Sequence, residues 1–186
     1  GVLQGKSVDP GEARTETQRK DFQLGSTLAE ALEAWTGTCL IDNYLDELDG
    51  FPAEEKISQG IFLGAGDQNN FVAVALVKLA DGRVGFEVTS QFAFDFVGET
   101  TPKTDFYEVS ALATAGPLDT VTLGLDVNVA TAEVTPTWTY VLGGDVTSGS
   151  GTAVALAGDA LAALEGTLTL PDNTGGQVPV GLAVGV

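Results

Sequence analysis

Apolar and polar residues alternate with a period of two over much of this chain, a pattern typical of strands with one buried face. The longest alternation runs through 121–129 and resumes at 134–142, which predicts an antiparallel hairpin with a turn near Thr131. Pro136 has no backbone N–H, so we expect its strand to lie at a sheet edge or to carry a bulge. A further alternation over 84–96 places the phenylalanines on the same side as the other apolar residues, which predicts one or two strands with one solvent-exposed face.

The segment 57–78 predicts a second hairpin of a different kind. A short apolar run at 61–63 is followed by a polar turn at 64–70 and by an uninterrupted apolar run at 71–77. A strand without alternation has both faces buried, so 71–77 is expected in the middle of a covered sheet. The Asp81-Gly82 pair predicts the tight turn that follows it.

The other segments complete an all-β prediction. Residues 1–35 are expected to form an N-terminal arm ending in a short amphipathic helix at 26–35, for which a strand is the alternative. Residues 36–186 are predicted to form one antiparallel β-sandwich (jelly roll) with one or two short helices in the molecule as a whole. Its further predicted elements are a strand and acidic loop at 36–50, a strand at 106–109, a loop at 143–151, a helix at 159–166 with Asp159 as N-cap and Gly166 as its stop, and strands at 167–170 and 178–186.

Charge narrows the range of partners and habitats. The 186 residues carry a net charge of −18, from 26 acidic and 8 basic side chains. Such a polyanion repels phosphate backbones and anionic lipids, which argues against nucleic acid and membrane surfaces as partners. No apolar run reaches the roughly 18 residues that span a bilayer. The acidity fits a saline or extracellular setting, and a chain that begins at Gly1 without any methionine is expected to have lost a leader or to be a piece of a longer protein.

Missing residue types exclude several chemistries. Without histidine the chain lacks the usual general base and the commonest zinc ligand, so zinc sites and Ser-His-Asp catalysis are excluded. Cys39 is the single cysteine, which rules out an intramolecular disulfide and a CxxC pair. We expect Cys39 to be a small buried hydrophobe, with pairing to another chain as the alternative.

The acidic loop at 46–50 suggests a cation site. Asp46 and Asp49 are the candidate ligands, and Ca²⁺ is the cofactor that such oxygens would take. The spacing does not fit an EF-hand, because Leu48 falls where a ligand should alternate. A solvated loop is therefore the favoured interpretation. Glu47 and Asp49 also have the two-residue spacing of a glucan-cleaving carboxylate pair, but they lie in a turn, so we expect no enzyme activity.

Several segments together suggest a family. Gly60-Ile61-Phe62-Leu63-Gly64 followed by Asp67-Gln68-Asn69-Asn70-Phe71-Val72, the hairpin at 121–142, the Ala-Leu-Ala-Ala-Leu helix and the final Val-Gly-Leu-Ala-Val-Gly-Val strand come in a recognisable order. In this order they resemble concanavalin A-like (laminin-G-like) jelly-roll modules of large secreted bacterial proteins, over residues 36–186. Such modules usually continue into a further aromatic strand, which this chain lacks. A strand donated by the arm of a neighbouring chain would cover the edge left open.

The resemblance implies a non-catalytic, secreted or cell-surface module for adhesion or carbohydrate binding. Loop amides hydrogen-bond sugar hydroxyls and aromatic faces stack on sugar rings. Turn chemistry and core packing are the competing interpretations of these residues. The alternative function is a structural subunit of an extracellular filament or surface assembly held by strand or arm exchange, so the expected partners are a glycan or copies of the chain in a homo-oligomer. The candidate ligand-binding residues are Asp67, Gln68, Asn69, Asn70, Trp138 and Tyr140.

Overall fold

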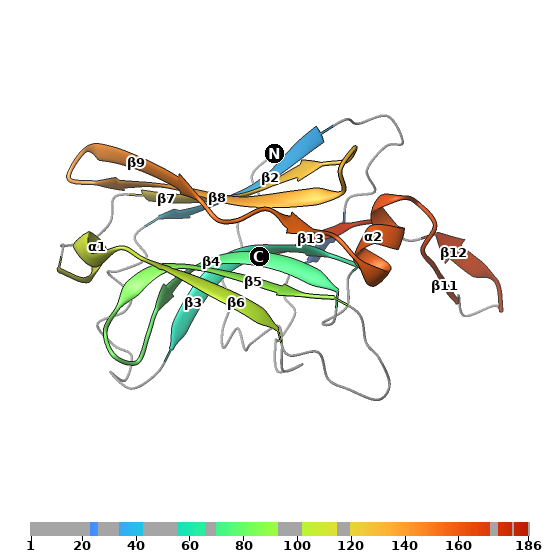
Figure 1. The fold of residues 1–186 in the computed structure, drawn as a ribbon, viewed down its shortest axis with the longest axis horizontal. Helices are drawn as coiled ribbons and strands as arrows, with labels where there is room; N and C mark the ends of the chain where they lie inside the picture. Colours follow the sequence, from blue (N-terminus) through green and yellow to red (C-terminus); the bar gives the residue numbers. More distant parts are fainter. Residues whose placement is uncertain are drawn as a thin grey trace.

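Two antiparallel sheets pack face to face in the computed structural model of the chain, with two short helices at their margins (Figure 1). The predicted fold class, an all-β antiparallel sandwich, is confirmed. The predicted helix at 26–35 lies largely outside the residues that the structure describes, and its last two residues open a strand. The structure describes residues 23–25, 34–42, 56–65, 70–92, 102–114, 120–171, 175–179 and 181–185.

The six-stranded sheet is built around the predicted hairpin of 57–78. Ile57 pairs with Lys78 and Gly64 with Phe71, so the two strands are joined along their whole length. As predicted, the second of them is buried on both faces, and Val74 and Val77, which point to opposite faces, are both fully buried. In spatial order the strands are β1 (Gln23–Gly25), β13 (Ala183–Gly185), β3 (Ile57–Gly64), β4 (Phe71–Lys78), β5 (Val84–Gln91) and β6 (Lys103–Glu108).

The N-terminal segment contributes to this sheet. Strand β1, which lies within the predicted arm, pairs antiparallel with the C-terminal strand β13, and Leu24 lies opposite Val184. The chain's own N-terminal region therefore pairs the edge of β13 that would otherwise be open.

The second sheet is five-stranded and contains the predicted hairpin of 121–142. Its strands are β2 (Ala34–Asp42), β7 (Thr120–Asn128), β8 (Glu133–Leu142), β9 (Asp145–Ser150) and β10 (Val154–Ala155). Strand β2 pairs with β7 over its whole length, and β7 pairs with β8. The turn of the hairpin is held by the Asn128 side chain, whose Oδ1 accepts bonds from the N–H groups of Ala130 (3.0 Å) and Thr131 (3.2 Å).

The prediction of a loop over 143–151 is wrong, because β9 forms there. Gly143 and Gly144 both have positive φ, 59° and 88°, as the primed two-residue hairpin turns require. The chain therefore reverses within two residues, and β9 pairs with β8 from Leu142↔Asp145 to Thr137↔Ser150.

A bulge separates β9 from β10 opposite Pro136. Thr137 pairs with Ser150 but Val134 pairs with Val154, so three steps on β8 face four on the partner. The Gly151 N–H donates to the Pro136 carbonyl oxygen at 2.9 Å. The backbone N–H and C=O of one strand residue point toward the same neighbouring strand. The position at which Pro136 lacks an N–H therefore lies opposite the bulge, where no ladder bond is lost. The expected bulge is thus confirmed.

Aromatic rings fill the space between the sheets. Phe86 on β5 is fully buried and stacks on Trp138 of β8, with ring centroids 4.8 Å apart and planes inclined by 15°. Tyr140 lies 6.0 Å from Phe86, and Tyr107 of β6 lies 5.0 Å from Trp138. These rings, surrounded by branched aliphatic residues of both sheets, join β5 and β6 to β8 across the sandwich.

Helix α2 (Gly158–Leu164) is capped from another part of the chain. Its N-cap residue is Ala157, which has no side-chain capping bond, so the prediction of Asp159 as N-cap is wrong. The Asn70 side chain instead accepts a bond from the Asp159 N–H at 3.3 Å. The predicted stop at Gly166 is confirmed by its φ of 69° and by the Schellman bonds to the carbonyls of Ala162 and Ala163.

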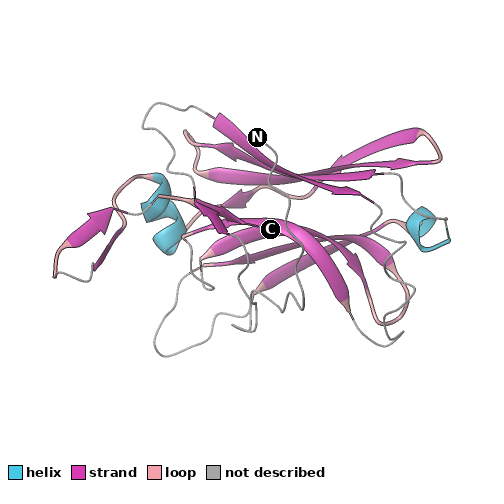
Figure 2. Cartoon of the chain, turned by 180° about the vertical axis from the view of Figure 1, so that it is seen from behind, coloured by secondary structure: helices cyan, strands magenta, loops and turns pink. Residues whose placement is uncertain are grey.

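The last predicted strand is divided in two. β11 (Thr169–Pro171) and β12 (Gln177–Pro179) form a separate small hairpin that projects beyond α2 (Figure 2), whereas β13 returns to the six-stranded sheet. Pro179 lacks the N–H that would continue a ladder, which is consistent with a break there.

The other helix, α1 (Ser110–Thr114), was not predicted and follows shortly after β6.

The predicted tight turn at Asp81-Gly82 is confirmed and carries a testable ion pair. The Asp81 carboxylate accepts bonds from Arg83 Nε (2.8 Å) and from the Arg83 backbone N–H (3.1 Å), while Gly82 has a φ of 87°. The side-chain hydrogen bond from Arg83 lowers the pKa of Asp81 below its ordinary value. A lowered folded-state pKa stabilises the fold above the ordinary aspartate pKa, and this contribution is lost as the pH falls through the lowered one.

In Arg83→Ala we expect the pKa of Asp81 to rise toward that of a free aspartate, as measured by the pH dependence of its side-chain ¹³C NMR shift. Lys103→Ala is the matched control. Lys103 contacts Asp105 at 3.5 Å, so this substitution removes one positive charge from a different ion pair. An unchanged Asp81 titration in Arg83→Ala would contradict the assigned cause.

Candidate functional site

Of the predicted loop residues, only Asn70 lies within the described part of the chain. Asp67, Gln68 and Asn69 of the turn and Asp46 and Asp49 of the acidic loop fall outside it, as does Glu47. Asn70 is only 3 % exposed, and its backbone carbonyl oxygen accepts a bond from the Ala65 N–H at 3.0 Å. Together with its bond to α2, this makes Asn70 a structural link between the β3–β4 turn and the helix.

Trp138 and Tyr140 lie in the core. Both are buried, and their rings pack against Phe86 and Tyr107. A sugar ring stacks on an exposed aromatic face, and here those faces are occupied by other rings. The competing interpretation of these two residues, core packing, is the arrangement that the structure has.

Cys39 lies on β2 and is half-buried. Burial raises the pKa of its thiol, which disfavours the reactive thiolate. Over the ranges given above, no three acidic or cysteine side chains gather where they would hold a metal ion. The same residues include no helix long and apolar enough to cross a membrane.

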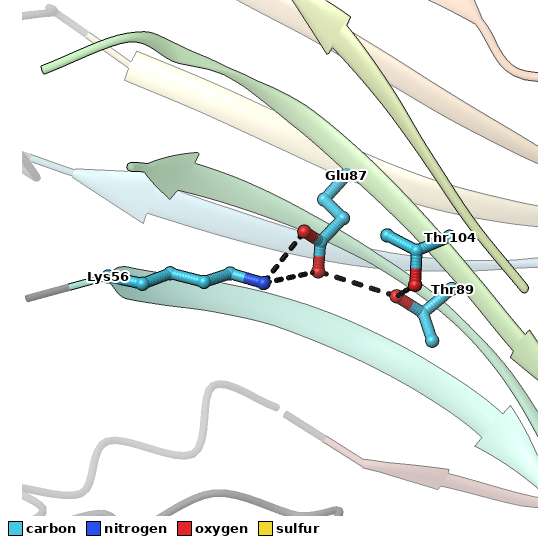
Figure 3. A network of polar contacts seen from close by, with 4 residues as sticks. All are labelled: Lys56, Glu87, Thr89 and Thr104. Atoms are coloured by element: carbon cyan, nitrogen blue, oxygen red, sulfur yellow. Dashed lines mark hydrogen bonds and ion pairs between the residues drawn. The ribbon is translucent and has the colours of Figure 1, made fainter. Parts of the chain in front are cut away.

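The outer face of the six-stranded sheet carries a polar network around Glu87 (Figure 3). Lys56 Nζ contacts both carboxylate oxygens, at 2.8 and 2.7 Å, and the Thr89 hydroxyl donates to Oε1 at 3.4 Å. Thr89 in turn lies 3.4 Å from the Thr104 hydroxyl on β6. The Glu87 side chain is only 12 % exposed, so a cation beside it offsets the cost of burying its charge. This network ties the start of β3 to β5 and β6.

The outer face of the five-stranded sheet is more accessible and differs in chemistry. Its two central rows run Thr38–Gly124–Thr137–Ser150 and Leu40–Thr122–Thr139–Ser148 and contain no charged side chain. The row beside them runs Thr36–Asp126–Thr135. We call this surface the hydroxyl face; its exposed or half-buried hydroxyl residues are Thr36, Thr38, Thr122, Thr135, Thr137, Thr139, Ser148 and Ser150.

A shallow, open hollow lies at one end of the hydroxyl face. Two of its lining residues, Asp126 and Asn128, are partly engaged by their neighbours. Asp126 Oδ1 accepts a bond from the Thr36 hydroxyl at 2.7 Å, and a carboxylate has a second oxygen that can also accept hydrogen bonds. The amide oxygen of Asn128 is taken by the turn, so its NH₂ group is what this side chain offers to a ligand. The residues lining the hollow are Ala34, Asp126, Val127, Asn128, Ala130 and Thr135.

The hollow thus combines a carboxylate acceptor, an amide donor and a hydroxyl with small apolar side chains. No family model, curated protein or solved structure matches this chain. The geometry of the hydroxyl face and its hollow therefore has to carry the functional argument.

Sequence reasoning did not find this surface, although one signal was present. The polar residues that alternate through 122–128 predict only an ordinary exposed face, and the composition of 143–151 predicts a loop where β9 forms. Alternation shows which residues point outward, but only the register across β2, β7, β8 and β9 brings their hydroxyls side by side.

Proposed function

We propose that this chain is a non-catalytic, extracellular β-sandwich module that binds a neutral carbohydrate on the hydroxyl face. The observation that carries the proposal is a surface of hydroxyl side chains, free of charge in its central rows, on a protein whose net charge is −18. The excess negative charge repels anionic polymers, whereas a neutral sugar chain is not repelled. The resemblance to concanavalin A-like modules supports the same function.

The hollow would anchor the sugar. Sugar hydroxyls both donate and accept hydrogen bonds, and the Asp126 carboxylate, the Asn128 amide and the Thr135 hydroxyl supply the complementary groups. Ala34 and Ala130 offer small apolar contacts to the C–H faces of the ring. Because the hollow is shallow and the described part of the face has no aromatic side chain, we expect weak binding that gains strength from repeated units of a polymer.

Affinity electrophoresis through neutral glucans, mannans, galactans and xylans, with a sulfated galactan for comparison, tests the proposal. We expect retardation by at least one neutral polymer and none by the anionic one. A neutral hydrogen bond contributes about 0.5–1.5 kcal/mol and one to a charged group about 1.5–3 kcal/mol, so Asp126→Ala combined with Thr135→Ala should weaken binding by at least about tenfold.

The matched control is Asp145→Ala combined with Thr147→Ala, which removes the same two residue types at exposed positions beside the β8–β9 turn, at the opposite end of β8 from the hollow. Retardation equal to that of the unsubstituted chain is expected for this control. Absence of retardation by every neutral polymer, or equal weakening in the two double variants, would contradict the proposal.

A further inference from the structure

Strand β2 is an edge of the five-stranded sheet, with β7 on one side and no described strand on the other. Leu40 on its outer face is 62 % exposed. Gly37 and Cys39 lie on the inner face of β2, as Ile41 does, yet they are only half-buried. By contrast, Leu123 and Leu125 on the inner face of neighbouring β7 are fully buried. The partial exposure of inward-facing residues indicates that the edge of β2 is accessible.

The other edges in the described part of the chain are protected against pairing. β6 carries Lys103, Asp105 and Glu108, and charged side chains discourage the approach of another strand. The edge formed by β9 and β10 is interrupted by the bulge opposite Pro136, and the edge strands β1, β11 and β12 are each only three residues long. β2 has nine residues, Ala-Trp-Thr-Gly-Thr-Cys-Leu-Ile-Asp, with no proline, no lysine and its one charged residue at the very end. It is thus the edge that lacks these protections.

We propose that β2 is a self-association edge, at which the chain pairs antiparallel with the β2 strand of a second copy. The edge of a strand is complementary to itself about a two-fold axis, which satisfies the symmetry of a homodimer. Full overlap of Ala34–Asp42 with itself centres the axis on Thr38 and places Leu40 opposite Thr36 of the second copy.

The placement of charge along β2 favours the centre of the strand as the contact between two acidic copies. Full overlap places Asp42 opposite Ala34 of the second copy, so the two Asp42 residues lie at opposite ends of the paired segment. The uncharged centre is therefore where two acidic molecules can approach with least repulsion. The two five-stranded sheets would become one continuous sheet, with the two hydroxyl faces side by side.

The dimer should be weak and favoured by salt. Pairing of one edge buries less than the area of about 1,200–2,000 Å² that stable complexes bury, so association is expected only at high protein concentration. The net charge of −18 makes two copies repel each other. The screening length of this repulsion falls from about 30 Å at 0.01 M salt to about 3 Å at 1 M salt. Sedimentation velocity of the full chain should show a dimer fraction that rises with salt.

Thr38→Asp tests the register, because it places two carboxylates opposite each other on the axis, where like charges destabilise a strand pair. We expect this variant to remain monomeric at the salt and protein concentrations where the unsubstituted chain dimerises. Ser150→Asp, which adds the same charge at an exposed position on the opposite edge strand β9, should dimerise as before. A dimer unaffected by Thr38→Asp, or a monomer at every concentration and salt, would overturn the proposal.

A cysteine trap provides a second readout that does not depend on affinity. In a Cys39→Ser background, Thr38→Cys should form an intermolecular disulfide under mild oxidation, since directly paired residues in antiparallel strands lie about 4.5–5.5 Å apart. Ser150→Cys in the same background is the control. Cross-linking of the Thr38→Cys chain no faster than the control would count against the proposed pairing.

Discussion

Replacing Phe86 with alanine is expected to lower the free energy of unfolding by about 3–5 kcal/mol, the range for a fully buried phenylalanine. The Phe86 ring stacks on Trp138 and lies beside Tyr140, so its removal leaves a cavity at the contact between the two sheets. Domains of this kind have about 5–15 kcal/mol in total, so the variant should lose a large part of its stability. Urea denaturation followed by tryptophan fluorescence measures the change.

Phe106→Ala is the matched control for this substitution. Phe106 lies on the outer face of β6, is half-buried, and has the Arg83 guanidinium 5.5 Å from its ring centre. Its removal takes away the same ring without opening the space between the sheets, so a clearly smaller loss is expected. Equal losses in the two variants would show that the aromatic cluster does not hold the sheets together as described.

Gly60→Ala is expected to lower the free energy of unfolding by about 1–3 kcal/mol, because the added methyl group overpacks the sheet. A Cβ atom at this position on β3 would overlap the Val74 carbonyl oxygen and would lie 2.7 Å from the Cα and Cβ of Ala75. These atoms belong to the neighbouring strand β4, which cannot move aside without disturbing a ladder paired on both sides. The midpoint of urea denaturation should fall accordingly.

Gly124→Ala is the matched control for Gly60→Ala. A Cβ at Gly124 would lie 2.5 Å from the Thr137 hydroxyl oxygen, which is the end of a side chain that can rotate away. Alanine also restricts the unfolded chain, an effect that favours folding by about 0.4–1 kcal/mol. Gly124→Ala should therefore be far better tolerated, and a loss as large as that of Gly60→Ala would contradict this explanation.

The hydrophobic pattern was sufficient for the elements whose sequence matches their local environment. The alternation at 121–142 and the continuous apolar run at 71–77 correspond to β7, β8 and the doubly buried β4. The pattern failed where a single turn decides the structure. The Gly143-Gly144 pair permits a two-residue reversal, and composition alone does not distinguish the polar strand after it from a loop.

Tertiary contacts explain the rest of what could not be predicted. Asp159 has the chemistry of an N-cap, yet the N-cap position is Ala157, and the Asp159 N–H is bonded by the side chain of Asn70, 89 residues away in sequence. Trp138 has the same alternation whether it faces a core or a ligand, and only its stacking on Phe86 decides between them. The hollow joins β2 to the β7–β8 hairpin, so it could not be assembled before the sheet order was known.

The most direct test of the central proposal is to map the ligand on the protein. Titration of the chain with a neutral oligosaccharide from the best retarding polymer, followed by threonine-methyl and backbone NMR shifts, identifies the contacted surface. We predict shifts at Thr36, Asp126, Asn128 and Thr135, with smaller ones along the hydroxyl face. Shifts centred on Glu87 and Thr104 of the other sheet, or no shifts at any concentration, would contradict the account.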